Sequence, residues 1–232
     1  MARLPRLAVA GQAHLVIQCA NEGRPVFVDD EDRARYLLAL SDAARVDGIA
    51  VHAFAMLDHR IELLVTPAAA ESLGRFMQRI GRRYVPVFNH RHGTEGALWA
   101  GRFQAAALDA ERYLLRALLL VEQSPVRAGV VAQATEWAWS SARHHAGREA
   151  SPVITEHAAW WQTGNTPFER EARHEAELQR ALRGDEVTEL LDAARGGWPL
   201  GSADFIRALE QTSMRAMRPR PRGRPRLPEP EI

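Results

Sequence analysis

The sequence contains no lysine and a single cysteine, Cys19. All 30 basic residues are therefore arginines, which excludes Schiff-base chemistry, a P-loop lysine and a lysine general base. One cysteine excludes an intrachain disulfide and a cysteine-based zinc cluster, and it fits a reducing cytoplasm. No apolar run reaches the roughly 18 residues that a spanning helix needs, and no long apolar segment follows the N-terminal arginines. We therefore expect neither a membrane span nor a signal peptide.

Hydropathy patterns along the first two thirds of the 232 residues predict alternating strands and helices. Strands are expected at 14–18, 49–57, 60–66 and 102–108, with a tight turn at Asp58-His59 between the second and the third. Helices are expected from Asp29 or Asp30 to Gly48, and over 72–92 and 110–123. The order β-α-β-β-α-β-α predicts an α+β, ferredoxin-like domain with both crossover helices on one face of the sheet.

Composition divides the chain into three parts. Residues 1–147 form the ferredoxin-like domain, and 148–211 form a tryptophan-containing, charged helical extension. Within it, 167–195 is interpreted as a solvated helical face and 202–211 as one more short helix. Residues 212–232 form an Arg/Pro-rich tail, which we expect to be extended and mobile because it cannot build a core.

The net charge of +1 hides an uneven distribution. The tail carries six arginines and no acid over 215–226, and residues 74–127 hold nine arginines against four acids, so the other segments are acidic. Such asymmetry favours a polyanionic partner, although an arginine face can also be merely solvated. The motif Arg222-Gly223-Arg224-Pro225 is similar to an AT-hook, which binds the minor groove of A·T-rich duplex; a generic polybasic tail is the alternative.

Several segments together resemble the REP-associated tyrosine transposases, IS200-like members of the HUH-type single-strand transposases. The resemblance covers nearly the whole chain. It is carried by Gly11-Gln12-Ala13-His14, Leu98-Trp99-Ala100-Gly101-Arg102-Phe103, Glu111-Arg112-Tyr113-Leu114-Leu115, Pro125-Val126-Arg127-Ala128-Gly129, Trp139-Ser140-Ser141 and Gly197-Trp198-Pro199-Leu200-Gly201-Ser202.

The resemblance implies a ferredoxin-like fold and a two-part active site. In the family, a His-apolar-His triplet on the third strand, helped by a polar ligand from the last helix, binds a divalent metal that polarises the scissile phosphate. A tyrosine on the last helix attacks phosphorus and forms a 5′-phosphotyrosine link to single-stranded DNA.

This chain departs from that pattern at both places. The triplet aligns with Arg60-Ile61-Glu62, so both histidines are replaced, and strand alternation puts Arg60 and Glu62 on one face, where an ion pair is expected. The tyrosine position is Leu120. Tyr113 lies seven residues earlier, about 10 Å along the helix, too far to act without a shift in register.

Three hypotheses follow. The first is a DNA-binding protein of this transposase type, catalytically impaired, which recognises hairpins or single-stranded ends and needs no cofactor. The second is an active transposase with a rebuilt site, using Tyr113 as nucleophile and Glu62 with Glu122 as ligands for Mg²⁺ or Mn²⁺. The third is a repurposed or decaying copy that acts through protein partners, for example through the charged helix at 167–195.

We expect a cytoplasmic, nucleoid-associated bacterial protein and, by analogy with the family, a homodimer. Trp99 is a candidate for stacking on an unpaired base, or else a core residue. The candidate DNA-binding residues are Arg75, Arg79, Arg82, Arg83, Trp99, Arg102, Arg218, Arg220, Arg222, Arg224 and Arg226.

Overall fold

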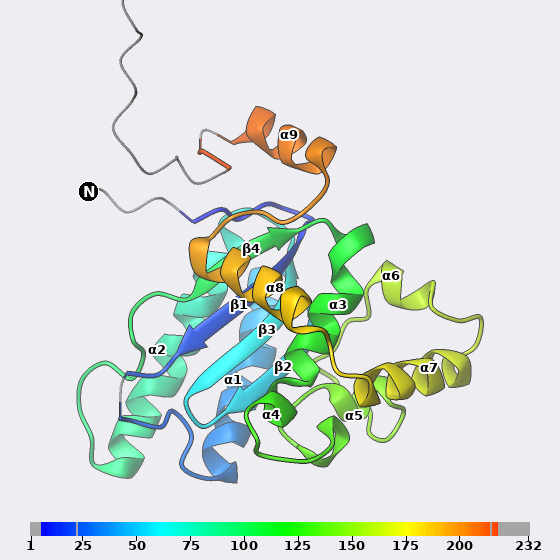
Figure 1. The fold of residues 1–232 in the computed structure, drawn as a ribbon. Helices are drawn as coiled ribbons and strands as arrows, with labels where there is room; N and C mark the ends of the chain where they lie inside the picture. Colours follow the sequence, from blue (N-terminus) through cyan, green and yellow to red (C-terminus); the bar gives the residue numbers. More distant parts are fainter. Residues whose placement is uncertain (1–5, 22, 214, 218–232) are drawn as a thin grey trace, which may run out of the picture.

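The structure is a computed structural model that describes residues 6–21, 23–213 and 215–217. Its centre is a four-stranded antiparallel sheet with the spatial order β2-β3-β1-β4 (Figure 1). The strands are β1 (Ala13–Cys19), β2 (Ile49–Leu57), β3 (Arg60–Pro67) and β4 (Gln104–Leu108). The predicted ferredoxin-like order of elements is confirmed.

One face of the sheet is covered by α1 (Asp30–Asp47) and α2 (Ser72–His92). The Asp29 side chain caps the first turn of α1 by accepting a hydrogen bond from the backbone N–H of Asp32, and Gly48 ends the helix in the left-handed conformation. Phe76, Ile80 and Tyr84 bury the apolar stripe of α2 against this face. The sequence predicted both helices, and for α1 it also predicted the cap and the C-terminal glycine.

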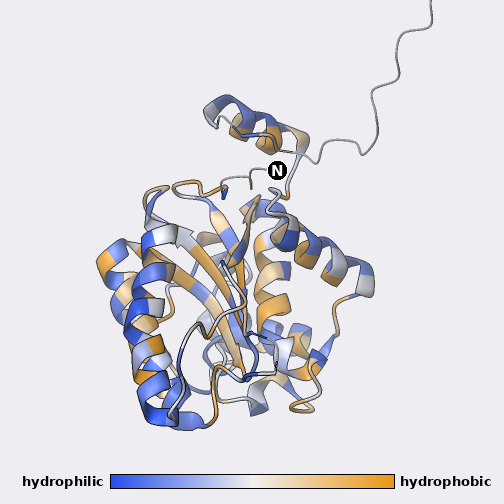
Figure 2. Ribbon diagram, turned by 90° about the vertical axis from the view of Figure 1, so that its left-hand side faces the viewer, coloured by the Kyte–Doolittle hydropathy of each residue, from blue (hydrophilic) through white to orange (hydrophobic). Residues whose placement is uncertain are grey.

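The opposite face is covered by α3 (Ala110–Glu122) and α8 (Gly184–Gly196). Leu15 and Leu64 point into this second core, where they meet Leu118 of α3 and Leu190 of α8. Apolar residues therefore line both faces of the sheet and the inner sides of the flanking helices (Figure 2). The first helix of this layer was predicted as such, whereas α8 was expected only as part of a solvated helix.

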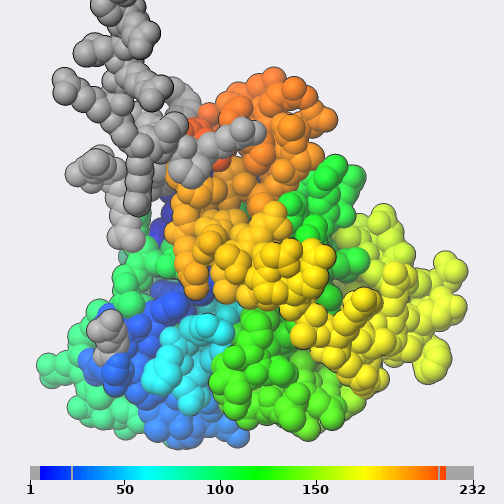
Figure 3. All heavy atoms as spheres, viewed as in Figure 1, coloured from blue at the N-terminus to red at the C-terminus, as the bar shows by residue number. Residues whose placement is uncertain are grey.

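Short elements connect these layers. α4 (Ser124–Arg127) follows α3 directly, and η1 (Ala134–Glu136), α5 (Ala142–His145) and α6 (Ala158–Trp161) lead to α7 (Pro167–Gln179). After α8 the chain continues to α9 (Ala203–Thr212). In Figure 3 the yellow-orange segment of α8 lies next to the blue and green segments of the first half of the chain.

The charged segment 167–195 is two helices, and each buries one side. Arg170, His174 and Leu178 of α7 are buried, as are Leu190 and Ala194 of α8. The interpretation of this segment as a solvated face therefore holds only for the outer side of each helix. The tail arginines from Arg218 onward lie outside the described residues. Within the described ranges, we find no helix that is both long enough and apolar enough to cross a membrane.

Two core tyrosines provide a matched test of the α1–α2 layer. The Tyr84 hydroxyl donates a hydrogen bond of 2.5 Å to the carbonyl oxygen of Val26, whereas the buried Tyr36 hydroxyl has no hydrogen-bond partner in the described part of the chain. Tyr84→Phe leaves a buried carbonyl without its donor, so we expect it to lower the free energy of unfolding by about 1 kcal/mol. Tyr36→Phe, its control, should leave stability unchanged or raise it. Denaturant titration of both variants checks this, and equal losses would contradict it.

Candidate active site

Arg60 and Glu62 are the first and third residues of β3, and their side chains lie on the sheet face that α3 covers. Ile61, between them, packs into the core beneath α1 and α2, as strand alternation requires. Glu62 lies opposite Ile17 of β1 and Ala55 of β2, and its side chain is 1% exposed. Arg60 and Glu62 therefore share one face of β3, as strand alternation predicts.

Both oxygens of the buried Glu62 carboxylate face donors or cations. Ser124 donates a hydrogen bond of 2.7 Å to Oε1, and Nε of Arg60 lies 2.9 Å from the same oxygen. Nη2 of Arg127 lies 3.5 Å from Oε2. Arg60 also donates to the Ser124 hydroxyl at 3.0 Å, so strand β3 and helix α4 are joined by one polar network.

The electrostatics of this network do not fit a divalent cation. Burial raises the pKa of Glu62, while Arg60, Arg127 and the Ser124 hydroxyl act to keep the carboxylate ionised. Burial also lowers the pKa of Arg127. Two guanidinium groups thus share one carboxylate, leaving an excess positive charge that would repel Mg²⁺ or Mn²⁺. A hard metal needs several oxygen ligands, whereas Oε1 of Glu62 already accepts from Ser124 and contacts Arg60. Oε2 is buried without a hydrogen-bond partner among the described residues, and the Arg127 guanidinium lies 3.5 Å from it.

The aligned nucleophile position offers no hydroxyl. Leu120 is fully buried in the core between the sheet, α3 and α8. Tyr113, the candidate substitute, donates a hydrogen bond of 3.1 Å to Glu189 of α8, and the guanidinium of Arg116 lies 4.5 Å from its ring centre. Burial and the Glu189 carboxylate raise the pKa of Tyr113, which disfavours the phenolate form that attack on phosphorus requires.

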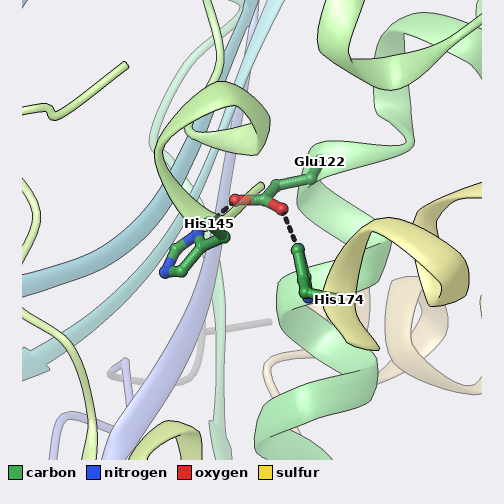
Figure 4. A group of neighbouring side chains, drawn as sticks. All are labelled: Glu122, His145 and His174. Carbon is green, nitrogen blue, oxygen red and sulfur yellow. Dashed lines mark hydrogen bonds and ion pairs between the residues drawn. The ribbon is translucent and has the colours of Figure 1, made fainter. Parts of the chain in front are cut away.

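A second buried carboxylate, Glu122, lies at the last residue of α3 (Figure 4). His145 of α5 lies 2.6 Å from its Oε1 through Nδ1, and His174 of α7 lies 2.6 Å from its Oε2 through Nε2. The Ser141 hydroxyl donates a third hydrogen bond, of 2.5 Å, to Oε1. Although burial opposes ionisation, the two imidazoles outweigh it and hold the pKa of Glu122 below its usual range.

These three side chains could hold a metal only after rearranging. Their ligand atoms all lie within 4.8 Å of one another. However, ligand atoms bound to one tetrahedral Zn²⁺ at about 2.0–2.1 Å lie roughly 3.3 Å apart, whereas each imidazole nitrogen here lies at hydrogen-bond distance from its own carboxylate oxygen. The cluster is therefore arranged as a hydrogen-bonded anchor between α3, α5 and α7.

The two carboxylates proposed together as a metal pair have separate partners. Glu62 is held by β3 and α4, and Glu122 by α5 and α7. Gln123, which follows Glu122 and precedes Ser124 in the chain, donates to the carbonyl oxygens of Leu178 and Arg180 and accepts from the N–H of Leu182. It ties the end of α3 to the connection between α7 and α8.

The arginines of α2 face the acidic residues of α1. Arg79 pairs with the buried Asp47 at 2.7 Å, and Arg75 lies 3.6 Å from the same carboxylate. Arg83 pairs with Asp42. Arg82 is exposed, and among the described residues no ion pair involves it. Most of the predicted basic surface on α2 is therefore compensated within the protein.

The two loop candidates before β4 differ in exposure. Trp99 is partly buried, and its ring packs edge-on against Tyr36 with 6.3 Å between centres. Its indole N–H is buried and has no hydrogen-bond partner in the described ranges. Arg102 is exposed. The structure thus gives Trp99 core contacts, while stacking on a base stays a prediction.

Several site residues escaped the sequence analysis. His145 and His174 lie 23 and 52 residues from Glu122, a separation that matches no local metal or catalytic motif. In the sequence, Arg127 stood out only within the segment Pro125-Val126-Arg127-Ala128-Gly129 and in the arginine count, and Ser124 was not among the candidate residues. The combination of a buried strand Glu with a nearby strand Arg was the one available signal for this network.

Comparison with known proteins bears on the fold. No protein-family model matches the chain, and no curated protein matches it. A solved REP-associated tyrosine transposase bound to a REP hairpin matches with a TM-score of 0.53 and 17% identity, over 68% of this chain and 93% of that one. The chain has the fold of this transposase. A candidate transposase from Deinococcus radiodurans R1 matches less well, with a TM-score of 0.36 and 20% identity over 50% of this chain and 93% of the other.

Replacing Glu122 tests the anchor. In Glu122→Gln two imidazoles lose a buried carboxylate, so we expect the free energy of unfolding at pH 7 to fall by about 3–5 kcal/mol. Because the folded pKa of Glu122 lies below its ordinary value of 4.5, this stabilisation is present above about pH 4.5 and is lost as the pH falls below it. Urea titrations between pH 3 and 7 should show a steeper acid loss for the wild type than for the variant.

An equal acid slope in the two proteins would contradict this assignment. Glu177→Gln provides the control. Glu177 lies on α7, as His174 does, but its side chain takes no part in the anchor. A rise in the melting temperature of the wild type with Zn²⁺, lost in Glu122→Gln, would instead show that the cluster rearranges around a metal.

Proposed function

We propose that the protein binds DNA hairpins or single-stranded DNA ends with a transposase fold and does not cleave the strand. The observation that carries this proposal is the network of Arg60, Glu62, Ser124 and Arg127, because it fills the position that the resemblance assigns to the metal. Leu120 in place of the tyrosine supports the same conclusion independently. Loss of both catalytic parts leaves the fold and the arginine-rich surfaces as the features available for function.

DNA is the partner that the fold and the charge favour. The solved transposase with this fold is bound to a REP hairpin. Here the tail carries six arginines without an acid over 215–226. Binding governed by such charges depends on phosphate contacts and weakens as salt rises. Minor-groove binding by the tail, nucleoid association and homodimerisation are parts of this proposal that follow from the sequence and the family alone.

The other two hypotheses have weaker support. A rebuilt site needs Glu62 and Glu122 on one metal and Tyr113 beside it, yet these side chains have different partners, and Tyr113 faces α8. A protein-binding role for 167–195 needs a free helix, but both α7 and α8 pack into the domain. We therefore favour DNA binding without strand transfer.

A hairpin oligonucleotide with a nicked cleavage strand tests this function. With Mg²⁺ or Mn²⁺ present, we expect a mobility shift at low salt that weakens as salt rises, and no adduct that survives SDS. The reason is that binding needs only the arginines, whereas the adduct needs a metal and a phenolate.

Tyr113→Phe is the control for the covalent step, and it should bind as the wild type does. Absence of any mobility shift at low salt would overturn DNA binding. An SDS-stable adduct that disappears in Tyr113→Phe would instead establish the rebuilt active site.

A further inference from the structure

A cavity of about 430 Å³ lies between α4, η1 and the C-terminal end of α7. Its volume falls within the range of about 300–1,000 Å³ that is usual for small-molecule sites, so it can accommodate one nucleotide. Arg127 lines this cavity and also takes part in the network around Glu62. The cavity is therefore directly beside the buried carboxylate of β3.

The cavity carries an excess of positive charge. Among the described residues that line it, only Arg127 and Glu175 are charged, and Glu175 is paired with Arg148. Arg127 has to share Glu62 with Arg60, so two guanidinium groups face one carboxylate. One positive charge beside the cavity thus remains without a carboxylate of its own, and such a charge attracts an anion more strongly in a partly buried place than in water.

The guanidinium of Arg127 also has hydrogen-bonding capacity that the protein does not use. Its Nη1 and Nη2 are buried, and neither has a hydrogen-bond partner in the described part of the chain. Nη2 lies 3.5 Å from Oε2 of Glu62, which is too long for a good hydrogen bond. Buried donors without acceptors cost free energy, and in native proteins a bound ion or ordered water often satisfies them. The two donors form a fork that matches two oxygens of one phosphate.

Arg127 can turn toward the cavity without leaving Glu62 unpaired. The Arg127 side chain is 23% exposed, whereas that of Glu62 is 1% exposed. Ser124 donates to Oε1 of Glu62 at 2.7 Å, and Nε of Arg60 lies 2.9 Å from the same oxygen. These closer partners keep the buried carboxylate compensated when the outer torsions of Arg127 change. Arg60 then balances Glu62, and the charge of Arg127 is free to pair with a phosphate.

The other walls of the cavity suit the base and the sugar of a nucleotide. Val126 and Leu178 offer apolar surface on which a base can pack. The Thr135 hydroxyl and the Gln179 amide form no hydrogen bond with a described residue, so both can bond to a base edge or a sugar oxygen. Because each of these groups both donates and accepts, we expect little preference among the four bases.

We propose that this cavity binds one nucleotide of a single-stranded DNA end, with its phosphate on Arg127 and its base against Val126 and Leu178. The proposal rests on the DNA binding proposed above and gives the end of the strand a place in the protein. A terminal phosphate carries a charge of about −1.5 to −2 at pH 7, so it interacts with the excess positive charge more strongly than a phosphodiester does.

The test uses the full-length protein and fluorescent hairpins with a short single-stranded overhang. One hairpin carries a 5′ phosphate, one a 3′ phosphate, and one only hydroxyl ends. We expect one phosphorylated hairpin to bind about tenfold or more tightly than the hydroxyl form, because its phosphate accepts charge-assisted hydrogen bonds. Arg127→Gln should abolish this preference, and Arg127→Lys, which keeps the charge without the fork, should retain part of it.

Two further variants control for charge and for folding. Arg180→Gln removes an exposed positive charge close to the cavity in sequence, but Arg180 does not line it, so the preference for phosphate should persist. Ala181→Trp fills the cavity from an exposed position and should abolish the preference with Arg127 intact. Thermal melts show whether each variant is folded. If Arg127→Gln is unfolded, Ala181→Trp decides the question.

The outcomes separate the cavity from the general function. A wild type that binds all three hairpins equally overturns the cavity proposal and leaves DNA binding standing, whereas a wild type that binds none overturns both. A preference for phosphate that survives Arg127→Gln or Ala181→Trp also overturns the assignment.

A competition arm distinguishes a DNA end from a free nucleotide, which carries the same phosphate. At constant ionic strength, we expect micromolar deoxyadenosine monophosphate to leave the phosphorylated hairpin bound, because the hairpin has additional contacts outside the cavity. Displacement at micromolar concentration would identify the cavity as a site for free nucleotides and would overturn the assignment to DNA.

Discussion

Two buried carboxylates, Glu62 and Glu122, determine how the C-terminal end of α3 is joined to the rest of the protein. Removing a carboxylate from water costs several kcal/mol unless ion pairs and hydrogen bonds replace the solvent. Here Glu62 has Arg60, Arg127 and Ser124, and Glu122 has His145, His174 and Ser141. The first set fixes β3 to α4, and the second fixes α3 to α5 and α7. Loss of either carboxylate leaves buried donors without an acceptor.

The arrangement around Glu62 also determines the chemistry available at this place. A divalent metal brings two positive charges and takes oxygen ligands, whereas the structure supplies two guanidinium groups that compete for the same carboxylate. The positive charge is thus built into the protein. It balances the charge of the buried Glu62 carboxylate.

Much of the fold could be predicted because its signals are local. Alternation placed Arg60 and Glu62 on one face, and Asp29 and Gly48 delimited the first helix. The second carboxylate site could not be predicted, because His145 and His174 reach Glu122 from distant helices. The charge count over 74–127 was also misleading as a map of the surface. Asp42 and Asp47 lie outside that range but compensate arginines within it.

A cleft beside β4 is a second feature that the sequence did not predict, because its residues are distant in the chain. Arg6, Arg195 and Arg215 lie far apart in the chain, and the fold brings all three to the same cleft as Arg102. Arginines that are widely spaced along the sequence therefore lie close together in the structure. Residues after 148 therefore line the same cleft as the loop before β4.

The most direct test of the closed metal position is a titration of Mn²⁺ followed by electron paramagnetic resonance, with the hairpin DNA present. If the guanidinium network occupies that position, the free Mn²⁺ signal in protein with hairpin will equal that of hairpin alone. A stoichiometric loss of free Mn²⁺ that is abolished in Glu62→Gln, but retained in Glu122→Gln, would contradict the account.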